Sequence, residues 1–178
     1  MLSVSEMMPA LPTLARGTSD DDSFRMITIT HASMCEPVFG IAPGRAEIWA
    51  TLRTRRDDNM AELCADAEKL TERSAADHQL TCAMDYQEIF VASVNEPEAV
   101  GHLRRALDEE GVRHSDDALP MRAPEDFGLF ERNLKPAIFF LGAGEHHPTL
   151  HNPDYDFPDD LIPIGSRVFM RVAANLLG

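Results

Sequence analysis

The sequence is poor in cysteine, in long apolar runs and in positive charge, and each shortage excludes a class of protein. Its 178 residues include three cysteines, Cys35, Cys64 and Cys82, which are far apart and form no CxxC pair. A disulfide framework and a cysteine-rich zinc site are therefore not expected. The thiols are predicted to be buried and reduced, as in a cytoplasmic protein.

No apolar run has the length that a membrane span needs. The first residues carry Glu6 and lack the basic start and apolar stretch of a signal peptide, so a cytoplasmic location is expected.

The shortage of positive charge argues against a nucleic-acid partner. The chain has 16 Lys and Arg against 30 Asp and Glu, a formal charge of -14, and such a chain repels phosphate backbones. The densest basic cluster, Arg53, Arg55 and Arg56, is followed at once by Asp57 and Asp58.

What is present is an ordinary globular composition, with 44% hydrophobic and 26% charged residues. The length suits one domain with a real core, or pieces of two small ones.

The first half of the chain has the pattern β-β-α-β. Residues 1–15 resemble the end of a helix, and residues 24–31 and 45–53 alternate apolar and polar side chains, which predicts a hairpin with a long loop. Helical spacing follows over 57–76, and a third strand is expected at 80–94. A ferredoxin-like sandwich has the order β-α-β-β-α-β, so the first strand of such a domain is not found and the chain is expected to begin inside a domain.

The second half alternates helices with one apolar strand. Asn95 is predicted to cap a helix that Gly111 ends, and a short helix is expected at 125–134. Residues 136–141 (PAIFFL) read as a strand buried on both faces, and 160–177 as a final helix with Val168, Phe169 and Leu176 inward. The expected fold class is therefore α/β, of the α+β kind.

The residues richest in chemistry lie in the loop at 141–160, directly after that strand. Histidines and carboxylates on such a loop can bind a divalent metal, although a solvated acidic loop is the alternative for each of them. Adjacent His146 and His147 cannot readily share one site, whereas His151 lies between Leu150 and Pro153, which would hold it in place.

Several stretches together resemble the aminoacylase/carboxypeptidase-type co-catalytic metallohydrolases, and in particular the amidohydrolases that include hippurate hydrolase. The resemblance rests on these stretches: Pro124-Glu125-Asp126-Phe127, Phe139 to Gly144, Leu150-His151-Asn152-Pro153-Asp154-Tyr155-Asp156-Phe157, Ala42-Pro43-Gly44-Arg45-Ala46-Glu47 and Thr51-Leu52-Arg53-Thr54. It implies that residues 1–94 are part of a ferredoxin-like lid and dimerisation domain. Residues 95–178 would be the C-terminal part of an α/β catalytic domain.

The resemblance implies hydrolysis of the amide bond of N-acyl amino acids at a centre of two divalent ions, Zn, Mn or Co. Among the residues of this chain it assigns one metal ligand, His151, and no catalytic residue. Arg53 is implied to pair with a substrate carboxylate, with an exposed arginine at a strand end as the alternative. Gly142 and Gly144 would line the substrate pocket or simply form a tight turn.

Three further positions bear on the resemblance. Glu125 and Asp126 are expected to cap a helix, with Asp126 as an alternative pocket residue. Gly40 replaces an asparagine that many members of the family carry, and His31 is interpreted as structural.

One histidine cannot hold two ions. The first hypothesis is therefore the C-terminal part of a metal-dependent amidohydrolase that is inactive alone. The alternative is a non-catalytic interaction module whose lid-like half pairs edge strands in a homodimer or with a full-length homologue. Neither hypothesis includes a nucleic-acid or membrane partner.

Overall fold

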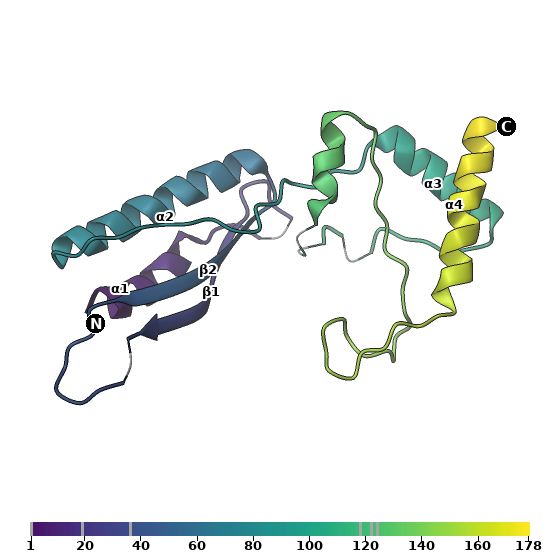
Figure 1. The fold of residues 1–178 in the computed structure, drawn as a ribbon. Helices are drawn as coiled ribbons and strands as arrows, with labels where there is room; N and C mark the ends of the chain where they lie inside the picture. Colours follow the sequence, from purple (N-terminus) through teal and green to yellow (C-terminus); the bar gives the residue numbers. More distant parts are fainter. Residues whose placement is uncertain (1, 19, 36, 118, 122, 124) are drawn as a thin grey trace. The chain divides into compact units, whose positions relative to one another are not determined.

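The computed structural model describes residues 2–18, 20–35, 37–117, 119–121, 123 and 125–178. The chain forms two compact units, Met1–Ala92 with Pro120–Pro124, and Ser93–Leu119 with Glu125–Gly178. Their elements mix helices with one two-stranded antiparallel sheet (Figure 1). This is the mixed α/β class expected from the sequence. None of the helices in the described ranges is long and apolar enough to cross a membrane.

The first unit is a β-hairpin covered by helices. Its elements are α1 (Leu2–Ala10), the 3-10 turn η1 (Leu11–Leu14), β1 (Arg25–Met34), β2 (Ala46–Thr54) and α2 (Asp57–Asp77). The predicted hairpin and the predicted helix after it are both confirmed. The two strands pair antiparallel from Arg25 opposite Thr54 to Met34 opposite Ala46, with an irregularity between Ile29 and His31.

This irregularity is a β-bulge, and it decides which face His31 occupies. Ile29 lies opposite Ala50, whereas His31 lies opposite Trp49, so Thr30 is the extra residue. His31 thereby reaches the open face of the sheet, where its ring centroid lies 4.9 Å from that of Trp49. The interpretation of His31 as structural agrees with this contact.

The core of the first unit lies between the other face of the hairpin and α2. Leu63 and Ala67 of α2 are buried with Ile27 of β1 and Leu11 of η1. Partly buried apolar residues packed against this cluster are Leu14, Ile29, Ile48, Ala50, Leu52 and Leu70. The alternation in the strands and the helical spacing in α2 therefore place their apolar residues on facing surfaces.

One charged side chain is buried beside this core. The side chain of Arg25 is 3% exposed and forms ion pairs with Glu62 and with Asp66, the latter at 3.1 Å between Nη1 and Oδ2. Both carboxylates lie on α2, one turn apart, so Arg25 ties the first strand to that helix. Its Nε is buried and has no hydrogen-bond partner among the described residues.

The predicted third strand at 80–94 is wrong. The segment runs along α2 and is held there by two hydrogen bonds (Figure 1). Tyr86 Oη donates to Glu68 at 2.9 Å, and Ala92 N donates to Asp57 at 2.8 Å. Left-handed backbone at Glu88 interrupts the predicted strand. A strand needs a neighbour to pair with, and in the described residues the sheet contains only β1 and β2.

The second unit packs two helices against each other. These are α3 (Pro97–Glu109) and α4 (Leu161–Leu177), and the 3-10 helix η2 (Asp126–Arg132) lies between them in the sequence. Ala106, Leu107 and Val168 form its buried cluster, with Leu103, Val112, Phe139 and Val172 partly buried around them. Polar contacts join the helix ends, where Arg171 Nε lies 2.8 Å from Glu110 and Asn175 Nδ2 donates to Glu109.

Several expectations for this unit need correction. The cap of α3 is Glu96, whose side chain accepts from Ala99 N at 2.9 Å, and not Asn95. Gly111, with φ of 68°, ends the helix as expected. The short helix expected at 125–134 is of the 3-10 type and lacks a side-chain cap, so the capping role of Glu125 and Asp126 is wrong.

Two apolar elements are less buried than expected. Residues 136–141 are not a strand, because strands to pair with are absent from the described part of this unit. In α4, Val168 is buried, but Phe169 is 63% and Leu176 is 56% exposed, because α3 covers only one side of this helix.

The three cysteines are free thiols, and their burial differs from the expectation. Cys35 and Cys82 are exposed and Cys64 is half-buried. Cys82 lies in the segment after α2, and Cys35 begins the loop that joins β1 to β2, so neither reaches a core.

Candidate functional site

The loop after residues 136–141 carries the sequence-predicted histidines and glycines. Gly144 has φ of 111°, a conformation that favours glycine, whereas Gly142 has ordinary backbone. Both are exposed, and a side chain would meet open space at either position. Gly144 therefore serves a sharp turn, and its role as a pocket residue stays a prediction.

A ring contact shapes the rest of this loop. The rings of His147 and Tyr155 meet edge to face with centroids 5.1 Å apart, and His147 Nδ1 donates to Pro148 O at 3.1 Å. His146 is exposed beside it. The adjacent histidines thus point to different environments, in keeping with the expectation that they do not share one site.

His151, the expected metal ligand, is exposed and has left-handed backbone with φ of 73°. In the described residues no three His, Cys, Asp or Glu side chains gather in a way that could hold a metal ion. A stable zinc site needs three or four protein ligands, so the donor set around His151 does not fit the Zn, Mn or Co ions that the resemblance implies. The role of His151 as a ligand stays a prediction.

Arg53 lies in β2 opposite Met26, on the face of the sheet that also carries Trp49. Its neighbours in sequence have partners, because Arg55 pairs with Asp22 and Arg56 with Asp58. Within the part of the chain that the structure describes, the half-buried Arg53 forms neither an ion pair nor a side-chain hydrogen bond. Its guanidinium is therefore available to a carboxylate from outside the unit.

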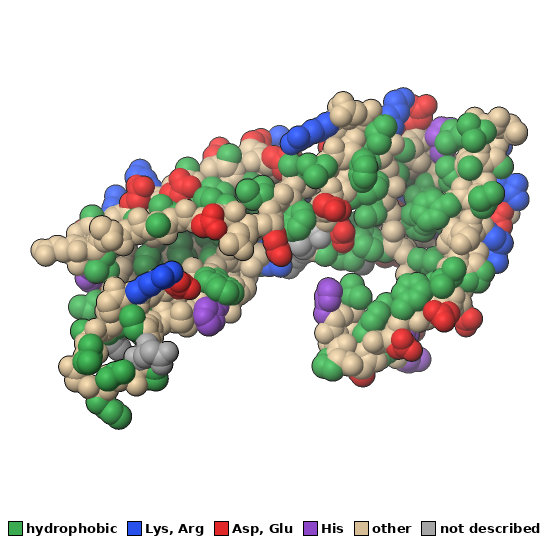
Figure 2. Space-filling view, viewed as in Figure 1, with side chains coloured by type: hydrophobic (Ala, Val, Ile, Leu, Met, Phe, Trp, Pro, Cys, Tyr) green, Lys and Arg blue, Asp and Glu red, His purple; other side chains and the backbone are tan. Residues whose placement is uncertain are grey.

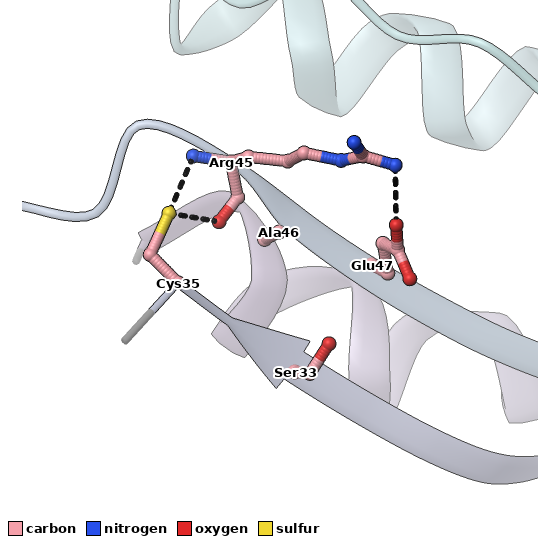
Figure 3. Close-up of a pocket in the computed structure, with 5 residues that line it drawn as sticks. All are labelled: Ser33, Cys35, Arg45, Ala46 and Glu47. Atoms are coloured by element: carbon pink, nitrogen blue, oxygen red, sulfur yellow. Dashed lines mark hydrogen bonds and ion pairs between the residues drawn. The ribbon is translucent and has the colours of Figure 1, made fainter. Parts of the chain in front are cut away.

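A hollow of about 260 Å³ lies at the end of the hairpin where the loop joins its two strands (Figure 3). It is lined by Ser33, Cys35, Arg45, Ala46 and Glu47. The Cys35 thiol donates to Arg45 O and accepts from Arg45 N, both at 3.3 Å, and Glu47 neutralises the Arg45 guanidinium at 2.5 Å. The thiol is thus bonded to the backbone of Arg45, and the charges of Arg45 and Glu47 neutralise each other.

The titration of the Tyr86 hydroxyl is strongly perturbed. Burial, together with the hydrogen bond to Glu68, raises the pKa of its hydroxyl well above its usual range. The phenol therefore stays neutral and acts as a donor that holds residues 80–92 against α2.

Sequence reasoning missed the ion pairs of Arg25. The signal was present in the spacing of Glu62 and Asp66, which lie four residues apart on one face of α2. Pro124, the first residue of one quoted motif, lies outside the described residues, so that part of the motif has no structural counterpart here.

Comparison with known proteins gave one family and no solved structure. Residues 8–175 match the model of the family described as Peptidase family M20/M25/M40. No solved structure matches the chain.

Proposed function

The chain belongs to Peptidase family M20/M25/M40, and on this basis we propose that it takes part in hydrolysing the amide bond of N-acyl amino acids or similar small substrates. Members of this family typically depend on a metal ion. The residues described in this chain do not by themselves fit such an ion, so the proposal assigns the metal ligands other than His151, and the catalytic base, to other polypeptide. The chain alone is then inactive.

The part that this chain contributes is recognition of the substrate carboxylate. The observation that supports this proposal is the guanidinium of Arg53, which lies on the open face of the hairpin sheet and forms no ion pair within the described part of the chain. A guanidinium can bind a carboxylate through two parallel hydrogen bonds, which orients the substrate as well as holding it. In this proposal, residues 1–94 form part of a lid and dimerisation domain, and residues 95–178 form part of a catalytic domain.

Two measurements test the proposal. The purified chain is incubated with Zn, Mn or Co and assayed with N-acyl amino acids, and we expect no turnover above the rate without protein. Robust turnover by the chain alone would contradict the assignment of the metal ligands to other polypeptide.

The second measurement is binding of an N-acetyl amino acid, followed by NMR titration. We expect Arg53→Gln to weaken binding by about tenfold or more, because a charge-assisted pair is lost. Arg55→Gln is the matched control, since Arg55 already pairs with Asp22. Equal loss in both variants would mean that binding depends on overall charge and not on Arg53.

A second candidate function follows from the sheet. In the described residues β1 and β2 form a two-stranded sheet, so a strand edge is open for pairing. The alternative proposal is a non-catalytic module that pairs this edge in a homodimer or with a full-length homologue. Light scattering and co-purification with such a homologue would test it, and a monomer without a partner counts against it.

A further inference from the structure

The edge of β2 that faces away from β1 carries backbone groups without partners among the described residues. Cys35 N donates to Arg45 O at 3.3 Å, so the backbone groups of Arg45 face β1. At the other end of the hairpin, Arg25 bonds through its N–H and its carbonyl to Arg16, so its groups and those of Thr54 opposite face outward. Backbone groups alternate in direction along a strand, and both observations give β2 the same alternation. The residues whose groups face outward are Ala46, Ile48, Ala50, Leu52 and Thr54.

Residues 80–87 have the side-chain pattern of a strand, but they pair with no strand that the structure describes. Apolar residues at the even positions alternate with small or polar residues at the odd positions. Tyr86 Oη donates to Glu68 of α2, so in an extended chain the even positions face this helix. They are nevertheless poorly covered, because Leu80 is 54% and Met84 is 41% exposed; Figure 2 shows hydrophobic side chains at the surface of this unit. The backbone of residues 81–87 forms no hydrogen bond with any described residue.

The contacts of α2 show on which side of the hairpin this segment lies. Leu63 of α2 packs on the hairpin, and successive residues of a helix are turned by about 100°. The two carboxylates that bind Arg25 of β1 therefore lie roughly 80° to one side of Leu63. The two carboxylates that bind Tyr86 and Ala92 lie roughly 130° to the other side. The segment thus lies on the flank of α2 away from β1, which is the side of the outer edge of β2.

Together β2, α2 and residues 80–87 form a strand–helix–strand unit whose two extended parts do not pair within the described residues. The helix returns along the hairpin from the end of β2, and the segment runs back along the helix (Figure 1). Leu80 N donates to Ala75 O near the end of α2, and Ala92 N donates to Asp57 at its start. The segment and β2 therefore run in the same direction. In a split βαβ motif a further strand lies between two such strands, and antiparallel pairing is its more stable orientation.

The chemistry required of such a strand follows from the surface of α2. The α2 residues between those that face the hairpin and those that bind the segment are half-buried and uncharged: Met60, Cys64 and Thr71. On the outer edge of β2, Ile48, Ala50 and Leu52 also face the helix. A strand that fits here has apolar side chains at alternate positions, directed towards α2.

A second copy of this chain does not offer such a strand in its described residues. A strand between two others needs both of its edges free. In this chain β1 and β2 pair with each other, and residues 80–87 form one side of the site. Residues 136–141 have one edge closed, because Asn95 bonds both the N–H and the carbonyl of Ile138 at 2.8 Å. The strand must therefore come from polypeptide outside residues 1–178.

We propose that an extended segment of polypeptide from outside residues 1–178 pairs between β2 and residues 80–87, antiparallel to both. Its apolar side chains cover Met84 and Tyr86, and its backbone bonds to both open edges. Strand addition of this kind takes its affinity from the main chain and its specificity from alternate side chains. The inference rests on the alternative function proposed above, to which it adds the edge and the direction of pairing, and it does not depend on hydrolysis.

Binding of a strand-forming peptide to the purified chain tests the proposal. The probe is acetyl-Lys-Val-Thr-Val-Thr-Val-Lys-amide, and the charge-matched control has proline in place of the central valine. In NMR titrations we expect saturable binding of the probe and about tenfold weaker binding of the control, because proline lacks an N–H. Failure of the probe to bind, or equal binding of both peptides, would overturn the proposal. Neither peptide carries a carboxylate, so recognition of a substrate by Arg53 is tested separately.

Two neighbouring substitutions locate the bound peptide. Met84→Lys places a charge on the face towards α2, and it should weaken binding of the probe by about tenfold because the ammonium loses water there. Ala83→Lys makes the same change in charge on the opposite face and should leave the affinity unchanged. Circular dichroism and urea unfolding like those of the wild type would show that both variants fold. Equal loss in both variants would mean that the apolar face does not take part, and it would contradict the proposal.

Hydrogen exchange gives a readout that does not depend on substitution. With the probe bound, the outward amides of Ile48 and Ala50 should exchange more slowly, whereas the amide of Thr51 faces β1 and should change little. Slower exchange at Ile27 and Ile29 instead would place the probe on the outer edge of β1 and would overturn the proposal.

Discussion

Replacing the buried arginine of the first unit should cost less stability than removing its carboxylate partners. The Arg25 side chain is 3% exposed, whereas those of Glu62 and Asp66 are 66% and 53% exposed. The desolvation cost of this cluster therefore falls mainly on the guanidinium, which also buries an unpartnered Nε.

The magnitudes follow from this asymmetry. Arg25→Met loses two hydrogen bonds to charged groups, worth about 1.5–3 kcal/mol each at most, but it frees both carboxylates to water and removes an unsatisfied donor that costs about 1–3 kcal/mol. The net change should be within about 1 kcal/mol. Glu62→Gln combined with Asp66→Asn leaves a buried guanidinium without counter-charge, and it should cost about 2–4 kcal/mol after allowance for the exposure of both carboxylates.

Urea unfolding followed by tryptophan fluorescence measures these changes. Trp49 is the single tryptophan and lies in β2, so its signal reports on the first unit. The control is Arg16→Met, because Arg16 is 52% exposed and 3.6 Å from Glu62; its change should stay below about 1 kcal/mol. The reasoning is refuted if Arg25→Met destabilises the unit more than the double carboxylate variant does.

Three other predictions concern acid, backbone strain and packing. The hydrogen bond from Arg104 lowers the pKa of Asp116, so its contribution to stability is present above the unfolded pKa and lost as pH falls through the folded value; thermal unfolding of the second unit should become easier below about pH 4. Gly144→Ala should destabilise the loop by about 1 kcal/mol because φ is 111°, whereas the control Gly142→Ala should change stability by less than about 0.5 kcal/mol in the same assay. Leu63→Ala opens a cavity at a fully buried position and should cost about 2–5 kcal/mol in urea unfolding.

Local pattern predicted the elements whose partners are close in sequence. Ile27 and Ile29 alternate with threonines, and Ile48 and Ala50 follow after one loop. Each strand of the hairpin therefore has its pairing partner close to it in the sequence. The same holds for α2, whose hydrogen bonds are internal and whose apolar stripe packs on that hairpin. In these cases the periodicity and the tertiary contact agree.

Pattern failed where an element depends on a distant partner. Residues 80–94 and 136–141 have strand composition, but side-chain apolarity does not show whether a neighbouring strand exists. Asn95 illustrates the same limit, because its amide is equally suited to a helix cap and to the pairing with Ile138 that the structure contains. Long-range geometry decided between the two.

In the candidate site, too, some features could be predicted from the sequence and others could not. The position of Arg53 on the open face follows from strand alternation alone. That it forms no ion pair with the residues the structure describes could be seen only once Asp22 and Asp58 were placed beside Arg55 and Arg56. The bulge at Thr30, which brings His31 to Trp49, has no glycine or proline to announce it. The exposure of His151 likewise depends on how the loop folds, which no residue pattern in it determines.

The contact between α1 and α2 sets an order of events during synthesis. Ser3 hydrogen-bonds Ser74 at 3.0 Å, and Glu6 pairs with His78 at 2.8 Å, so the first helix packs on residues made about seventy positions later. At ribosomal rates of about 5–20 residues per second, that interval lasts roughly 3–15 s. Throughout it, the face of α1 that packs on α2 is uncovered, whereas Leu11 can already pack on Ile27 of β1. The nascent α1 therefore keeps part of its packing surface exposed until α2 leaves the ribosome.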